Sequence, residues 1–101
     1  MSSGFVGIVS LDVRLSGSAT LKDRRSALAR IRHGLAERFG AAVAEVGDLD
    51  TPWHGELTAA VVEQTQSGCD QRITALEEWL ERETEGVSII QARIVTPEDL
   101  A

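Results

Sequence analysis

Basic side chains cluster where a helix is predicted to begin. Lys22, Arg24 and Arg25 lie close together, and Arg32 follows two helical turns after Arg25. The unpaired N–H groups of a helix's first turn carry partial positive charge, so cations there cost about 0.3–1 kcal/mol each. The same N–H groups, together with lysine and arginine, suit a phosphate or carboxylate. We therefore expect Lys22, Arg24, Arg25 and Arg32 to bind an anion.

A second group of side chains that could do chemistry lies in and beside a loop-like segment, residues 47–55. Four of these side chains could bind a hard metal ion or transfer protons: Asp48, Asp50, His54 and Glu56. No second histidine stands at ligand spacing, and there is no cysteine pair. The neighbouring Trp53 is expected to fold onto the sheet or to lie in an interface. We therefore expect no metal, no cofactor and no catalytic residue.

Charge is divided unevenly along the chain. Residues 1–38 contain seven basic and three acidic side chains, whereas residues 39–101 contain three basic and thirteen acidic ones. The net charge of −6 opposes tight non-specific binding to nucleic acid. A basic run on a helix is most often a solvated face. Here it could pair with acidic side chains of a second helix, namely Glu77, Glu78, Glu81 and Glu83.

The composition indicates one folded domain. The 101 residues are 43% hydrophobic and 26% charged, which is too apolar for a disordered chain and too short for two domains. The only cysteine, Cys69, cannot form a disulfide within the chain, and we expect it to be buried. No apolar stretch approaches the roughly 20 residues of a membrane span, and no secretory signal is visible. We expect a cytoplasmic protein without membrane association.

Apolar periodicity predicts two helices and four strands. Spacings of three, four and seven predict a helix over residues 21–39, with Thr20 as its N-cap and Gly40 at its end. Similar spacings predict a second helix over about residues 69–85, ended by Gly86. Alternation of apolar and polar residues predicts four strands, over residues 5–15, 41–46, 56–63 and 87–95. The last residues, 96–101, are expected to form a frayed tail.

The order strand, helix, strand, strand, helix, strand is that of the split βαβ plan. Right-handed crossovers place the first and third strands in the middle of the sheet, and these strands are the most apolar, as interior strands should be. We therefore predict an α+β, ferredoxin-like βαββαβ sandwich over residues 1–101. Its sheet is four-stranded and antiparallel, and both helices lie on one face.

The face that the helices leave open is also apolar at one end. In the predicted strands, Val6, Ile8, Ala60 and Val62 point away from the helices. A partner commonly buries an exposed patch of this kind, so we expect a homodimer formed through this face. The central strands place no aromatic ring there for base stacking, so any RNA would be held through its phosphates.

One segment resembles the signature of a known family. Residues 17–25, Gly-Ser-Ala-Thr-Leu-Lys-Asp-Arg-Arg, resemble the Gly-Ser-x-Ser-Leu-Lys-x-Lys-Arg signature of the YlxP-like family of small bacterial proteins. Thr20 stands where that signature has serine, and Arg24 where it has lysine. The likeness spans most of the first 62 residues, but Trp53 does not align with the Asp-x-Trp pattern of the family.

The resemblance implies a ferredoxin-like domain in an essentially uncharacterised family. Genes of that family lie beside those for translation initiation and ribosome maturation factors, which implies a ribosome- or RNA-associated role. We therefore expect a non-enzymatic, dimeric accessory protein that contacts phosphate through its first helix. The alternative is a protein-interaction module that uses the open sheet face and the acidic second helix without nucleic acid. A third hypothesis is a small-molecule enzyme or binding protein that uses the segment from Asp48 to Glu56.

Overall fold

Strands and helices follow one another in the predicted order, strand, helix, strand, strand, helix, strand. A computed structural model of the chain describes residues 3–17, 19–47 and 50–100. The elements are β1 (Phe5–Arg14), α1 (Leu21–Phe39), β2 (Ala42–Val46), β3 (His54–Glu63), α2 (Gln66–Glu83), β4 (Val87–Val95) and the 3₁₀ turn η1 (Pro97–Leu100). Among these residues, no helix combines the length and apolar character that crossing a membrane requires.

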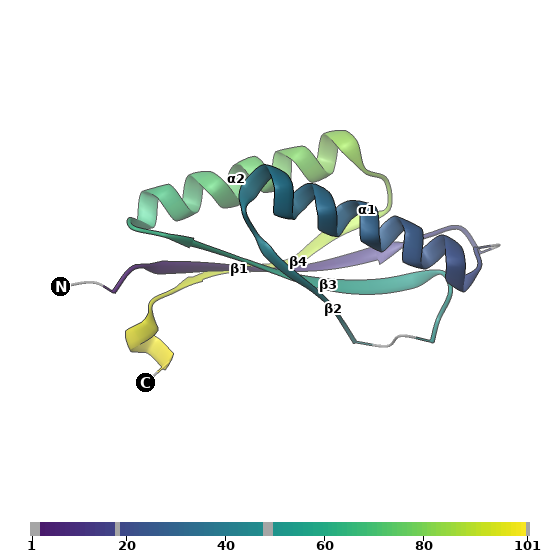
Figure 1. The fold of residues 1–101 in the computed structure, drawn as a ribbon, viewed down its shortest axis with the longest axis horizontal. Coiled ribbons are helices and arrows are strands. Elements are labelled where there is room, and N and C mark those ends of the chain that lie inside the picture. Colours follow the sequence, from purple (N-terminus) through teal and green to yellow (C-terminus); the bar gives the residue numbers. More distant parts are fainter. Residues whose placement is uncertain (1–2, 18, 48–49, 101) are drawn as a thin grey trace.

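The four strands form one antiparallel sheet in the order β2-β3-β1-β4. The two helices lie side by side on one face of this sheet (Figure 1). β1 and β3 occupy the middle, and their register runs from Phe5 opposite Glu63 to Arg14 opposite His54. This arrangement confirms the predicted α+β, ferredoxin-like plan.

The core lies between the sheet and the helices. Four elements each contribute a leucine that is at most 1% exposed: Leu11, Leu35, Leu57 and Leu76. Burying one such side chain stabilises the fold by about 1.5–3 kcal/mol. The helices approach each other closely at Gly34, where an added Cβ would lie 2.3 Å from the ring of Trp79. The predicted burial of Cys69 is confirmed.

Both predicted ends of α1 are confirmed. The hydroxyl of Thr20 accepts a hydrogen bond from the N–H of Asp23 (3.1 Å), and the Asp23 carboxylate accepts one from the N–H of Thr20 (2.9 Å). Gly40 ends the helix in the left-handed region, at φ 61°. The hydrogen bonds that the backbone and hydroxyl of Thr20 donate hold the pKa of Asp23 below its usual value. Its carboxylate is therefore engaged in capping the helix.

The second helix and the third strand both begin earlier than the sequence patterns indicated. α2 starts at Gln66 because the hydroxyl of Thr65 caps it, accepting a hydrogen bond from the N–H of Gly68 (3.0 Å). It ends at Glu83 because the backbone of Thr84 caps it, so Gly86 lies beyond its end. β3 includes residues 54–55, which were assigned to the loop, because these residues pair with β1.

The predicted frayed tail is instead partly folded. Residues 97–100 form η1, which lies on the side of the sheet opposite the helices and beside the N-terminal end (Figure 1). The N–H and hydroxyl of Ser3 donate hydrogen bonds to Glu98 Oε1, at 3.1 and 2.7 Å. Val95, which precedes this turn, is only 6% exposed. One end of the open face is therefore covered by the chain itself.

The contact between Ser3 and Glu98 predicts a lowered pKa for the Glu98 carboxyl group. The hydrogen bond from the Ser3 hydroxyl is the main cause that lowers the pKa of Glu98 from 4.5 to about 2. Because this folded-state pKa is depressed, the contact stabilises the docked turn above pH 4.5 and is lost as the pH falls towards 2. We expect Ser3→Ala to raise the pKa of Glu98, measured by NMR titration of its side-chain carboxyl carbon.

Ser88→Ala is the control for this titration, because Ser88 is an exposed serine on β4, a strand remote in sequence from Ser3. It should leave the pKa of Glu98 unchanged. A wild-type Glu98 that titrates at 4.5 would contradict the contact.

Candidate anion-binding site

Helix α1 carries more positive charge than its surroundings neutralise. Six of the ten basic residues lie on it: Lys22, Arg24, Arg25, Arg30, Arg32 and Arg38. Among these six, and counting partners within residues 3–17, 19–47 and 50–100, only Arg24 forms an ion pair. Within the described part of the chain, these side chains form no ion pair with the glutamates of α2, which was the alternative that the sequence left open.

The structure gives Arg24 a role that differs from the expected phosphate contact. Its side chain is 3% exposed and forms an ion pair with Glu45 of β2. It lies over Gly55 of β3, where an added Cβ would be 3.2 Å from Arg24 Nε and 2.8 Å from Leu28 Cδ1. Arg24 thus ties the first turn of α1 to the sheet, so it leaves the set of candidate anion-binding residues.

Lys22, Arg25 and Arg32 form a continuous exposed group, here named the basic stripe. At about 100° per residue, the three positions fall within about 80° of one another on the helix. This stripe lies on the side of α1 roughly opposite Gly34, the residue that contacts α2. A rise of 1.5 Å per residue places Arg25 and Arg32 about 10 Å apart along the axis.

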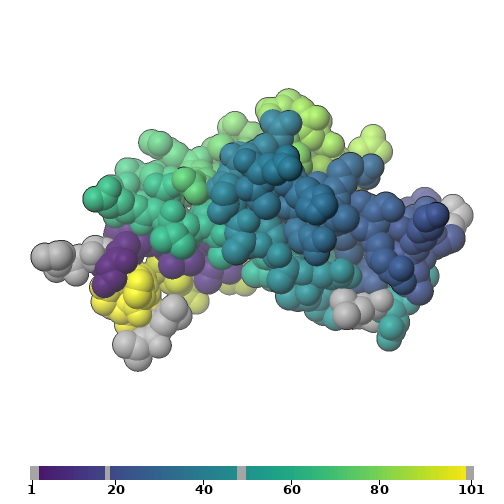
Figure 2. All heavy atoms as spheres, viewed as in Figure 1, coloured from purple at the N-terminus to yellow at the C-terminus, as the bar shows by residue number. Residues whose placement is uncertain are grey.

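A groove lies beside the basic stripe on α1. Its volume is about 330 Å³, and Arg25 and Arg32 lie along it with Ala29, while Leu28, Glu45 and Leu57 complete its lining. The outer surface of α1 is uncovered and faces the solvent (Figure 2). The groove therefore offers a ligand two arginines at the junction of α1 with the β2 side of the sheet.

A second, wider hollow is less suited to an anion. It has a volume of about 820 Å³ and lies where the end of β1, the start of α1 and the α2–β4 connection meet. Its charged lining mixes both signs: Arg14, Arg30, Asp23, Glu83 and Glu85. Because the acidic side chains outnumber the basic ones there, the basic stripe remains the better candidate.

The four candidate interface residues lie on the open face, as expected, but they differ in exposure. Val62 is 67% exposed, whereas Val6, Ile8 and Ala60 are half-buried. The register places Val62 opposite Val6 and Ile8 opposite Ala60, so the four side chains form one block on β1 and β3. Val62 is therefore the member of the block with the most apolar surface for a partner to cover.

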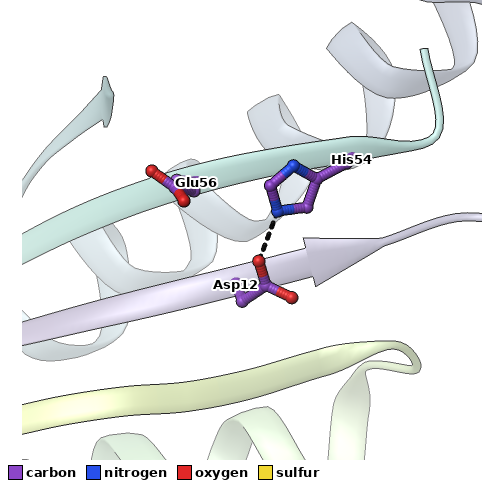
Figure 3. Close-up of side chains that lie close together, drawn as sticks. All are labelled: Asp12, His54 and Glu56. Carbon is purple, nitrogen blue, oxygen red and sulfur yellow. Dashed lines mark hydrogen bonds and ion pairs between the residues drawn. The ribbon is translucent and has the colours of Figure 1, made fainter. Parts of the chain in front are cut away.

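At the opposite end of this face, the structure brings together the side chains of Asp12, His54 and Glu56 (Figure 3). His54 Nε2 is hydrogen-bonded to Asp12 Oδ1, and Arg14 Nε lies 3.1 Å from Asp12 Oδ2. Glu56 lies directly opposite Asp12. Burial raises the pKa of Asp12, but the hydrogen bonds and charges of His54 and Arg14 together outweigh it and lower the pKa.

The sequence-based prediction had grouped His54 and Glu56 with residues of the loop. Of these, Asp50 is exposed in the connection, and Asp48 lies outside the described residues. The residue that the prediction missed is Asp12, which is remote in sequence. Its polar character in an alternating strand was the available signal, but only the register of β1 with β3 places it beside His54.

The ion pair between the buried Arg24 and the partly exposed Glu45 generates a prediction about stability. Removing Glu45 takes an ion-pair partner away from the buried guanidinium, which destabilises the fold. In a double-mutant cycle of Arg24→Met and Glu45→Gln, we expect a coupling energy of about 0.5–3 kcal/mol. Urea unfolding of the wild type, both single variants and the double variant measures it. Strictly additive effects would show that the two side chains do not interact in solution.

Comparison with known proteins places the chain in a family. The family model described as Protein of unknown function (DUF503) matches residues 6–94. Among curated proteins, none matches the chain. The fold is similar to the solution structure of the SecDF periplasmic domain P4, with a TM-score of 0.50 and 16% sequence identity over 92% of this chain and 88% of that one.

A second solved structure resembles the chain over part of its own length. It is an amidase of the hydantoinase/carbamoylase family from Burkholderia phymatum, with a TM-score of 0.48 and 16% identity; the match covers 94% of this chain and 28% of that one. At 16% identity, the likeness to domain P4 speaks to the fold alone. The family match is different, since it spans most of the sequence: the chain belongs to the DUF503 family of proteins of unknown function.

Proposed function

We propose that this protein binds RNA through the phosphate backbone, with Lys22, Arg25 and Arg32 as the contacting residues. The observation that carries the proposal is the basic stripe itself. Its three side chains are exposed, and within residues 3–17, 19–47 and 50–100 none of them forms an ion pair. The chain has a net charge of −6 and therefore many carboxylates that could pair with these cations. Because the three basic side chains are nevertheless left without an ion pair, the stripe is suited to binding a polyanion.

The architecture favours contacts with phosphates over contacts with bases. Sheets of this topology that read RNA stack bases on aromatic rings of the central strands. β1 and β3 place no phenylalanine, tyrosine or tryptophan on the open face; the phenylalanine of β1, Phe5, packs against the core on the other side. The groove beside Arg25 and Arg32 lies on a helix, where side chains reach phosphates without entering a base stack.

The resemblance of residues 17–25 to the YlxP-like signature supports the same proposal. That segment contains Lys22 and Arg25 of the basic stripe and leads directly into α1. Genes of the YlxP-like family lie beside genes for ribosome maturation and translation initiation factors, which suggests ribosomal RNA as the ligand. On this proposal, the protein is a non-enzymatic accessory factor of the cytoplasmic ribosome.

The proposal predicts RNA binding that depends steeply on salt. Three neutralised phosphates correspond to an affinity loss of about 20–40-fold between about 50 and 200 mM salt. Neutralising the basic stripe with Lys22→Gln, Arg25→Gln and Arg32→Gln should abolish most of the binding and flatten this dependence. Fluorescence anisotropy of a labelled ribosomal RNA hairpin measures both effects.

A charge-matched variant controls for the general effect of lost positive charge. Arg30→Gln, Arg82→Gln and Arg93→Gln remove the same net charge from exposed positions outside the stripe. This variant should retain near wild-type affinity. Equal losses in both triple variants would refute a localised site. Absence of binding at low salt would refute RNA binding altogether and favour the alternative function, protein docking through the open face and the acidic α2.

The exposed Val62 supports a homodimer formed through the open face. Val62 is an exposed apolar residue at one end of the open face, beside three half-buried apolar residues, and burying it against a second copy would remove it from water. We propose that two chains pack through the block of Val6, Ile8, Ala60 and Val62.

The homodimer is tested by a charge in the proposed interface. Val62→Asp should convert a dimer into a monomer in sedimentation velocity, because a buried carboxylate in the interface would lack a partner. Ile90→Asp is the control, since Ile90 is 60% exposed on the edge strand β4 and lies outside the block. A Val62→Asp variant that remains dimeric, or a monomeric wild type, would contradict this interface.

A further inference from the structure

Three side chains of metal-binding types converge on the polar end of the open face. They are Asp12 of β1 with His54 and Glu56 of β3, and one ligand atom from each lies within 4.8 Å of the other two (Figure 3). All three are half-buried. They stand on adjacent central strands, which hold their Cα atoms in fixed register. Such support by regular elements gives a site better defined geometry than a loop does.

The arrangement places two carboxylates where their charges repel each other. Asp12 and Glu56 are direct cross-strand partners on the same face, and like charges in that position destabilise a sheet. Asp12 is compensated by Arg14 and by the hydrogen bond to His54. Within residues 3–17, 19–47 and 50–100, no cation pairs with Glu56. A bound cation would remove this repulsion.

The donor set indicates the kind of ion. One imidazole nitrogen and two carboxylate oxygens suit a divalent transition metal, and zinc takes all three donors at about 2.0–2.2 Å. In a tetrahedral site, these atoms would lie about 3.3 Å apart. Because the present separations are at most 4.8 Å, modest side-chain rotations would close the site. We propose that Asp12, His54 and Glu56 form a zinc-binding site that leaves a fourth position for water.

Isothermal titration with zinc chloride tests this proposal on the full chain, free of any tag and stripped with EDTA. We expect one zinc ion per chain. Two variants each remove one ligand: His54→Ala and the nearly isosteric Glu56→Gln. Loss of a residue that only hydrogen-bonds to a metal ligand weakens metal binding by about 10–100-fold, so loss of a ligand itself should weaken zinc binding by more than that. His33→Ala is the matched control, because the exposed His33 lies on α1 and should leave zinc affinity unchanged.

Trp53 provides a second readout of the same event. Its ring lies 6.0 Å from that of His54, so zinc should change its fluorescence, and Trp53→Phe should remove this change. Wild-type protein without zinc binding, or Glu56→Gln and His54→Ala that both bind as tightly as wild type, would overturn the proposal. Magnesium or calcium binding as tightly as zinc would overturn the assignment to a transition metal. None of these results depends on RNA binding by α1.

Discussion

The antiparallel pairing of β1 with β3 is the constraint on which the rest of the molecule depends. Its register sends the apolar set of both strands to the helices, and a slip of one residue would move that set to the open face. The same register places Val62 opposite Val6 at one end and Glu56 opposite Asp12 at the other. Core, apolar block and polar cluster are therefore consequences of one alignment.

Much of the fold was predictable because its patterns are local. The apolar pattern of β1, β3 and α1 depends only on which side of each element is buried. The cap residues Thr20 and Gly40 likewise satisfy backbone groups that lie close to them in sequence. The start of α2 was missed because Gly68 resembles a helix breaker, whereas it donates to the Thr65 cap. The folded tail was missed because its contact, Ser3 with Glu98, spans nearly the whole chain.

The candidate sites were less predictable, since they depend on contacts between elements. Arg24 was expected to bind an anion, yet it lies in the buried row of α1, four residues before Leu28 and in line with Leu35. The spacing of Arg24 from these leucines can be read from the sequence. Its ion-pair partner, Glu45, belongs to another element, β2. Asp12 likewise could not be assigned to a site from the sequence, because only the pairing of β1 with β3 places it beside His54.

The basic stripe on α1 is the central functional claim. The most direct test is an NMR titration of the ¹⁵N-labelled protein with a ribosomal RNA hairpin, which follows every backbone amide at once. If the basic stripe binds RNA, the largest shift changes should lie on α1 around Lys22, Arg25 and Arg32, and they should disappear as salt is raised. Shift changes confined to α2 or to the open face of β1 and β3, with α1 unaffected, would contradict it.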